Sequence, residues 1–218
     1  MATPPETSSN GTPLTWADPQ HITIALAAGN LDQDSSVNPQ FTGPLDGQEA
    51  ALLVAAAQVW ESVANVHFAF VPDDNSVVAD IRVGLADLNS MGFIGYTSYH
   101  WNSSANFLSD TLLAVEDPDE QPVIATADGD LRYDGFNTTI FQDFEHELGH
   151  ALGLGHNTGD QTAIMNPIIG SKNPVPNAQD IAAIQSLYGP PTGALPMTAD
   201  QSAALHGLLA GTGLASMA

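Results

Sequence analysis

The chain carries the stretch HELGHALGLGH at residues 146–156, and this stretch decides the fold that we expect. His146 and His150 are four residues apart, so a helix places both imidazoles on one face, close enough to share one metal ion. Gly153 allows the chain to leave the helix through a conformation that a Cβ opposes, so that His156 can reach the same ion from another side. Three imidazoles leave the fourth position of a tetrahedral zinc open for water, which is typical of a catalytic site.

Glu147 directly follows the first histidine and can lean toward the metal without binding it. Zinc lowers the pKa of its bound water toward about 7 and polarises a carbonyl group. We predict that Glu147 accepts the water proton and passes it to a leaving amine. Two histidines and a glutamate occur on helices by chance, so that part of the motif alone is a weak signal. The addition of Gly153 and His156 at fixed offsets makes chance a poor explanation.

The motif lies in the strongest predicted helix, residues 139–152, where Thr139 and Gln142 form a capping box and Gly153 ends the helix. Helices are also predicted over residues 45–63 and 178–187, the latter with Asn177 as N-cap. Alternating or β-branched segments predict strands over residues 21–27, 66–71, 78–85, 93–99, 111–115 and 123–127. This order of elements predicts an α+β fold in which a mixed, twisted sheet carries helices on one side.

The charge of the chain is strongly acidic, with 25 Asp and Glu against three Lys and Arg among 218 residues, a net charge of −22. Such a surface repels phosphate backbones, so we expect no nucleic-acid partner. It suits calcium binding, high salt or simple solubility equally well. The absence of cysteine excludes disulfides, thiolate metal ligands and a cysteine nucleophile. No apolar run is long enough to span a bilayer.

We expect three parts along the chain: a flexible polar lead over residues 1–13, a catalytic domain over residues 14–190 and an Ala/Gly/Leu-rich tail over residues 191–218. The lead shows no standard secretion signal, although we expect a secreted or extracellular protein. The tail could be a short packed helix or part of a linker to a further module. We expect the protein to be a monomer.

The motif and the downstream segment Ala163-Ile164-Met165-Asn166-Pro167 together resemble the metzincins, metallopeptidases marked by HExxHxxGxxH and a methionine turn. The resemblance covers about residues 14–190 and is greatest to the matrixin-like and serralysin-like branch. It implies a metzincin-type fold, with a mostly parallel sheet and with the active-site and C-terminal helices on either side of a substrate cleft. It also implies that Met165 lies beneath the metal and supports the ligands without binding the ion.

The chain departs from its relatives at three points. Serralysins place an additional tyrosine ligand two residues after the methionine, where this chain has Pro167, so we expect three protein ligands, as in matrixins. Matrixins hold a second, structural zinc on histidines before the catalytic helix, but residues 123–132 contain no histidine and carry Arg132. We therefore expect no structural zinc. The cysteine that keeps matrixin precursors inactive has no counterpart here.

In this family an extended substrate adds itself to an edge strand of the sheet. The resemblance places that edge at about Val123–Thr126, with Ile124 and Ala125 as contacts, and a specificity pocket beside Pro167 and Ile168. Four acidic residues are candidate calcium ligands, with a solvated acidic surface as the alternative: Asp80, Asp117, Asp119 and Glu120.

We predict a zinc-dependent endopeptidase that acts on protein or peptide substrates. Two alternatives stay open. One is a zinc-containing binding or adhesion module without turnover, against which the intact Glu147 argues. The other is a narrow peptidase that processes one partner or itself. The remaining histidines are interpreted as ordinary surface or core residues: His21, His67, His100 and His206.

Overall fold

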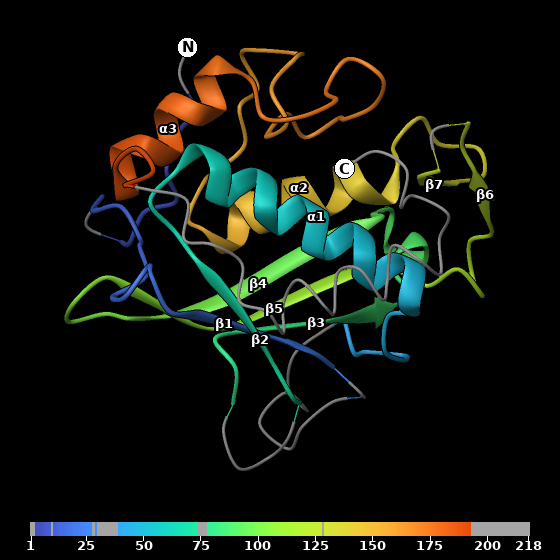
Figure 1. Ribbon diagram of the computed structural model, residues 1–218, viewed down its shortest axis with the longest axis horizontal. Coiled ribbons are helices and arrows are strands. Elements are labelled where there is room, and N and C mark those ends of the chain that lie inside the picture. The colour runs from blue at the N-terminus through green and yellow to red at the C-terminus, as the bar shows by residue number, and fades with distance from the viewer. Residues whose placement is uncertain are drawn as a thin grey trace.

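The structure is a computed structural model that describes residues 3–9, 11–27, 29, 39–73, 78–127 and 129–192 (Figure 1). Its main layer is a five-stranded sheet with the strand order β2-β1-β3-β5-β4. The strands are β1 (Ile22–Leu26), β2 (Phe68–Val71), β3 (Ile81–Ala86), β4 (Gly95–Asn102) and β5 (Phe107–Glu116). All neighbouring pairs are parallel except β4 with β5, and β4 forms one edge of the sheet. The predicted α+β fold with a mixed, mostly parallel sheet is confirmed.

Three helices accompany this sheet: α1 (Gly47–Val63), α2 (Ile140–Ala151) and α3 (Ala178–Tyr188). Figure 1 shows α1 and α2 side by side over one face of the sheet, with α3 beyond one end of α1. Each helix begins with a capping box, including the predicted one at Thr139 and Gln142. A short 3₁₀ helix, η2 (Asn89–Met91), lies between β3 and β4. None of the described helices is long and apolar enough to cross a membrane.

The core between α2 and its neighbours fixes how the motif helix is oriented. The predicted apolar stripe of α2 is fully buried, and it comprises Ile140, Phe144, Leu148 and Ala151. Trp60 of α1 is fully buried beside it and donates its indole N–H to the backbone oxygen of Glu145 at 3.0 Å. With one face fixed in the core, α2 presents another face toward β4, the edge strand that it contacts.

The predicted position of Val123–Thr126 at the edge of the main sheet is wrong. Residues Val123–Ala125 form β6, which pairs with β7 (Leu131–Tyr133) in a separate two-stranded sheet. This hairpin lies at one end of the molecule in Figure 1, beyond the start of α2. A short β segment in sequence does not indicate which sheet it joins, because the pairing depends on the turn that follows. Within the main sheet, the edge strand β4 and its neighbour β5 contact α2.

The N-terminal segment differs from the expected flexible lead. Pro5 forms an antiparallel bridge with Leu154, two residues before His156. The backbone N–H of Glu6 donates to Gly153 at 2.7 Å, and that of Gly155 donates to Pro4 at 2.7 Å. The described residues before position 10 are therefore packed against the end of the motif. The expected tail, apart from its first two residues, lies outside the described residues, as does His206.

Candidate active site

The structure brings together the three histidines of the motif. The Nε2 atom of His146 lies 3.1 Å from Nε2 of His150 and 3.3 Å from Nε2 of His156. One ring nitrogen from each histidine lies within 4.8 Å of the others, and among the described residues this is the group of side chains suited to a metal ion. Helical spacing on α2 accounts for the first pair, and the turn after α2 delivers the third.

Gly153 makes that turn possible. Its φ of 91° lies in the left-handed region, where a side chain is strained. A Cβ at this position would also overlap the backbone oxygen of Leu14. Hydrogen bonds from the N–H of Gly153 to His150 at 2.8 Å and from the N–H of Leu154 to Gly149 at 2.9 Å close the helix end. Both the dihedral angle and the close packing therefore require glycine here.

Backbone carbonyls orient two of the imidazoles. Nδ1 of His146 lies 2.7 Å from the oxygen of Ile164, and Nδ1 of His150 lies 2.7 Å from the oxygen of Leu154. Since a carbonyl only accepts, each Nδ1 carries the proton and each Nε2 presents a lone pair. Two lone pairs about 3.1 Å apart with no proton between them repel each other, and a cation between them removes that repulsion. The donor set therefore fits a metal that prefers neutral imidazole, such as zinc.

The surroundings also keep these imidazoles neutral, which is the form that binds metal. Burial lowers the pKa of His146 to about 4, although its hydrogen bond to the Ile164 carbonyl opposes that fall; the nearby His156 makes a smaller contribution in the same direction as burial. Burial and the two neighbouring histidines lower the pKa of His150 well below its usual range. Burial likewise lowers the pKa of His156. Protons thus compete weakly with a metal ion at this site.

Glu147 is buried on the same helix, and Thr97 of β4 donates its hydroxyl to Oε2 of Glu147 at 2.7 Å. Burial raises the pKa of Glu147 to about 7, while the Thr97 hydrogen bond opposes that rise. One turn earlier, Asp143 is also buried, and its pKa is raised well above the usual range by burial and then by the charge of Glu147. A Cβ at Gly95 of β4 would overlap oxygens of both carboxyl groups. The bare backbone of Gly95 therefore allows this close approach.

Neither Thr97 nor Asp143 stands out in the sequence as a functional residue. The four-residue spacing of Asp143 and Glu147 was available as a signal, because it predicts two carboxyl groups on one helix face. The contact of Thr97 was not available, because it depends on which strand packs against α2.

Met165 lies in the loop after the motif and is fully buried. Its backbone oxygen accepts from the N–H of Asn157 at 2.7 Å, directly after His156. The preceding residue, Ile164, donates its N–H to Asp180 of α3 at 2.8 Å while its oxygen faces His146. Pro167 and Ile168 follow on the surface, where Ile168 is 83% exposed. The assigned support role of Met165 and the substrate contacts of these two surface residues stay predictions.

The other residues predicted from the resemblance are dispersed. Ile124 and Ala125 are exposed on β6, so a substrate contact there stays a prediction. Asp80 precedes β3 and accepts both the N–H and the hydroxyl of Thr23, at 2.8 and 2.7 Å. Asp117 follows β5, at the opposite end of the parallel pair, and accepts from Thr42 at 2.5 Å. The structure does not gather Asp80, Asp117, Asp119 and Glu120 into one group, and calcium binding stays a prediction.

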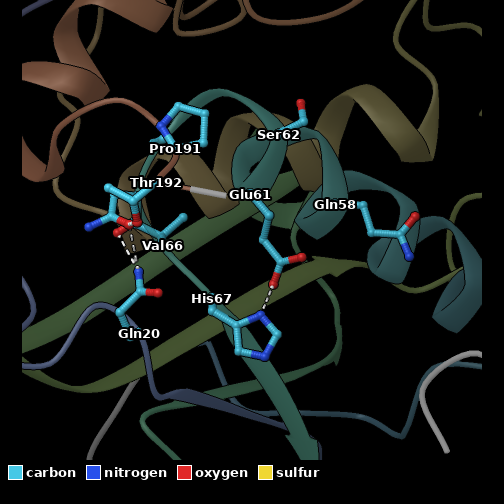
Figure 2. A pocket seen from close by; sticks show the side chains of 10 residues that line it. Gln20, Gln58, Glu61, Ser62, Val66, His67, Pro191 and Thr192 are labelled. Atoms are coloured by element: carbon cyan, nitrogen blue, oxygen red, sulfur yellow. Dashed lines mark hydrogen bonds and ion pairs between the residues drawn. The ribbon is translucent and has the colours of Figure 1, made fainter. Parts of the chain in front are cut away.

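A pocket of about 210 Å³ lies beside the C-terminal end of α1 and is lined by no residue of the motif (Figure 2). In it, Nδ1 of His67 pairs with Glu61 at 2.9 Å. Asn65 receives a hydrogen bond from Gln20 at 2.8 Å and one from Thr192 at 2.6 Å. These groups satisfy one another and join the segment before β1, the end of α1 and the segment after α3. We therefore interpret the pocket as a structural contact and not as the active site.

Comparisons with known proteins agree with this geometry. The sequence model of the matrixin family matches residues 41–189. The hatching enzyme of Paracentrotus lividus is 31% identical over 184 residues, which cover 83% of this chain and 27% of that protein. Matrix metalloproteinase-19 of Mus musculus is 30% identical over 144 residues, 64% of this chain and 25% of that protein. The chain thus spans about a quarter of the length of these relatives.

Proposed function

Since the chain belongs to the matrixin family of zinc-dependent metallopeptidases, we propose that it is an endopeptidase catalytic domain that uses one zinc ion held by His146, His150 and His156. The observation that carries the proposal is the convergence of three Nε2 lone pairs beside the buried carboxylate of Glu147. A closed structural site would have no use for an additional carboxylate at that position. Protein or peptide chains are the substrates that we propose, as for matrixins in general.

Each proposed role follows from the position of the side chain. The three histidines would hold the ion. Zinc bound there supplies an activated water and polarises the scissile carbonyl. Glu147 would accept a proton from the attacking water and return it to the leaving amine, and the burial that raises its pKa would favour the second transfer. Met165 packs beneath the ligands and keeps them in place.

The edge strand β4 is the part of the main sheet to which an extended peptide could add as a further strand. It borders α2, and so it lies on the same side of the domain as Glu147. Pro167 and Ile168 are exposed after Met165 and are proposed as one wall of the specificity pocket. We also propose that the protein acts outside the cell as a monomer and binds no nucleic acid, since its net charge is −22.

The direct test is Glu147→Ala in zinc-loaded protein, with cleavage of casein or of a peptide library as the readout. We expect normal zinc content and folding, and loss of most cleavage, about 100-fold or more. Cleavage equal to that of the wild type would overturn the role of Glu147. A zinc-loaded wild type that cleaves no peptide would favour the alternative of a binding module. New termini in protein incubated alone would indicate self-processing.

A further inference from the structure

The strand β4 and the helix α2 meet beside Glu147, and each presents two residues on the face where they meet. Gly95 and Thr97 are two residues apart on β4 and so share one face of the strand. Asp143 and Glu147 are four residues apart on α2 and so share one face of the helix. The two faces are in contact: Thr97 bonds to Glu147, and both carboxyl groups lie against the backbone of Gly95. The position of the Glu147 side chain is thus determined by β4 as well as by its own helix.

The Thr97 hydroxyl contacts Glu147 twice. It lies 2.7 Å from the carboxylate oxygen Oε2 and 3.1 Å from the backbone oxygen of the same residue. A hydroxyl has one proton to donate, and the shorter distance and the charge of the carboxylate favour Oε2. The hydroxyl therefore restrains one of the two carboxylate oxygens.

Such restraint matters for a glutamate that acts as a base. Its side chain has three rotatable bonds, and displacement of a catalytic group by about 1 Å can reduce a rate by about 100-fold. The carboxylate of Glu147 cannot accept a hydrogen bond from His146 or His150, because both direct their Nδ1 protons to backbone carbonyls. Thr97 supplies a donor from outside the motif.

We propose that Thr97 is a positioning residue for Glu147, and that Gly95 permits the contact by leaving room for the carboxylate. The proposal rests on the proposed function of Glu147 as the base. The Thr97 side chain, which is directed to Glu147, touches neither metal nor substrate in this assignment. Its effect is transmitted entirely through the carboxylate that it orients, so its loss affects turnover and leaves substrate affinity nearly unchanged.

The test is Thr97→Val, which removes the hydroxyl and keeps the shape of the side chain. We expect kcat to fall about 10- to 100-fold, with KM changed less than about twofold. Zinc content is expected to be unchanged. Thr97→Ser keeps the hydroxyl and is expected to restore kcat to within about threefold of the wild type. Thr97→Ala provides a second variant without the hydroxyl if valine does not fold at this position.

Thr111 offers a matched control. It lies on the neighbouring strand β5, is 1% exposed, and its hydroxyl has no hydrogen-bond partner among the described residues. Thr111→Val therefore makes the same chemical change inside the same sheet without touching Glu147. We expect it to leave kcat and KM unchanged, and a fall equal to that of Thr97→Val would show that the sheet, not the hydroxyl contact, determines the rate.

A double variant separates this proposal from the proposed function. If Thr97 acts through Glu147, then Thr97→Val lowers kcat in the wild type but not in Glu147→Gln. An equal further loss in the double variant overturns the positioning role. Full activity of Glu147→Gln alone overturns the proposed base instead. A crystal structure of Thr97→Val decides the positioning role independently of activity, because an unmoved Glu147 carboxylate contradicts it.

Discussion

The sulfur atom of Met165 lies against the bare backbone of Gly149. In the sequence, Gly149 stands between His146 and His150, the two helical histidines of the motif. A Cβ at Gly149 would overlap that sulfur and would lie 3.1 Å from both Cε of Met165 and Cζ2 of Trp60. The glycine inside this helix therefore serves packing, since Gly149 is otherwise unfavourable at a helical position. The contact joins the methionine turn to the helix that carries His146 and His150.

This contact predicts that Gly149→Ala destabilises the domain. Overpacking of a core costs about 1–3 kcal/mol, and the better helix propensity of alanine offsets about 1 kcal/mol of that cost. Urea unfolding of the zinc-free protein measures the net effect. Gly47→Ala is the control, because a Cβ there meets no atom within 4 Å. Equal stability of the two variants would contradict the packing role of Gly149.

Asp180 is connected to the metal ligand His146 through two successive hydrogen bonds, so we expect its replacement to affect both stability and zinc binding. It accepts from the N–H of Ile164 at 2.8 Å, and the oxygen of Ile164 accepts from His146. It is fully buried and also accepts from Thr3 at 2.7 Å and from the N–H of Asn177 at 3.1 Å. Asp180→Ala leaves these buried donors without an acceptor, and we expect it to lower the free energy of unfolding by about 3 kcal/mol or more.

The same variant is expected to weaken zinc binding about 10- to 100-fold, because the carbonyl that orients His146 loses its anchor. Competition with a chromophoric chelator measures the affinity. Asp180→Asn keeps an acceptor oxygen and should fall between the wild type and Asp180→Ala. If Asp180→Ala binds zinc as tightly as the wild type, the two hydrogen bonds do not tune the site.

Much of the fold was predictable because local signals and burial agree. The helix over residues 139–152 combined a capping box, an apolar stripe and a terminal glycine, and the structure has α2 at Ile140–Ala151. The strand predicted at residues 93–99 was found, but its place at the sheet edge was not predicted. Pairing between strands depends on contacts distant in sequence, and a pattern of alternating residues does not contain them.

In the candidate site, too, local spacing was predictable and contacts between distant segments were not. Spacing alone brings His146 and His150 together, and Gly153 indicates how His156 can approach them. Thr97 belongs to a strand about 50 residues away in the sequence, and no local pattern could predict its contact with Glu147. The packing of the N-terminal segment was not predicted for a similar reason. Its hydrogen bonds to residues 153–155 are made by backbone groups, which every sequence carries.

Zinc removal is expected to lower the melting temperature. A ligand at 100 times its dissociation constant stabilises the folded state by about 2.7 kcal/mol. For a domain of this size that corresponds to a change of about 5–10 °C. Differential scanning calorimetry with and without a zinc chelator measures it. His150→Ala should melt near the temperature of the chelated wild type and should not respond to added zinc, and a full response would argue against the three-histidine site.

Glu116 predicts how stability depends on pH. It is 0% exposed, and its Oε2 accepts from the N–H groups of Leu88 and Asn89 at 2.6 and 2.5 Å, while Oε1 has no partner among the described residues. Burial raises the pKa of Glu116 above its ordinary value of 4.5, although the two N–H groups oppose that rise. The folded protein therefore holds this proton more tightly than the unfolded chain does.

The sign of the pH effect follows from that difference. The contribution of Glu116 to stability is fully present below pH 4.5 and is lost as the pH rises through its folded-state pKa. The glutamine of Glu116→Gln cannot ionise, and it keeps one acceptor oxygen for the N–H groups of Leu88 and Asn89. The stability of this variant therefore does not fall with rising pH for this reason. Urea unfolding of zinc-free protein at pH 5 and at pH 8 should show the wild type losing stability relative to Glu116→Gln. A constant difference between the two proteins would mean that the buried carboxyl group ionises in the folded protein as easily as in the unfolded chain.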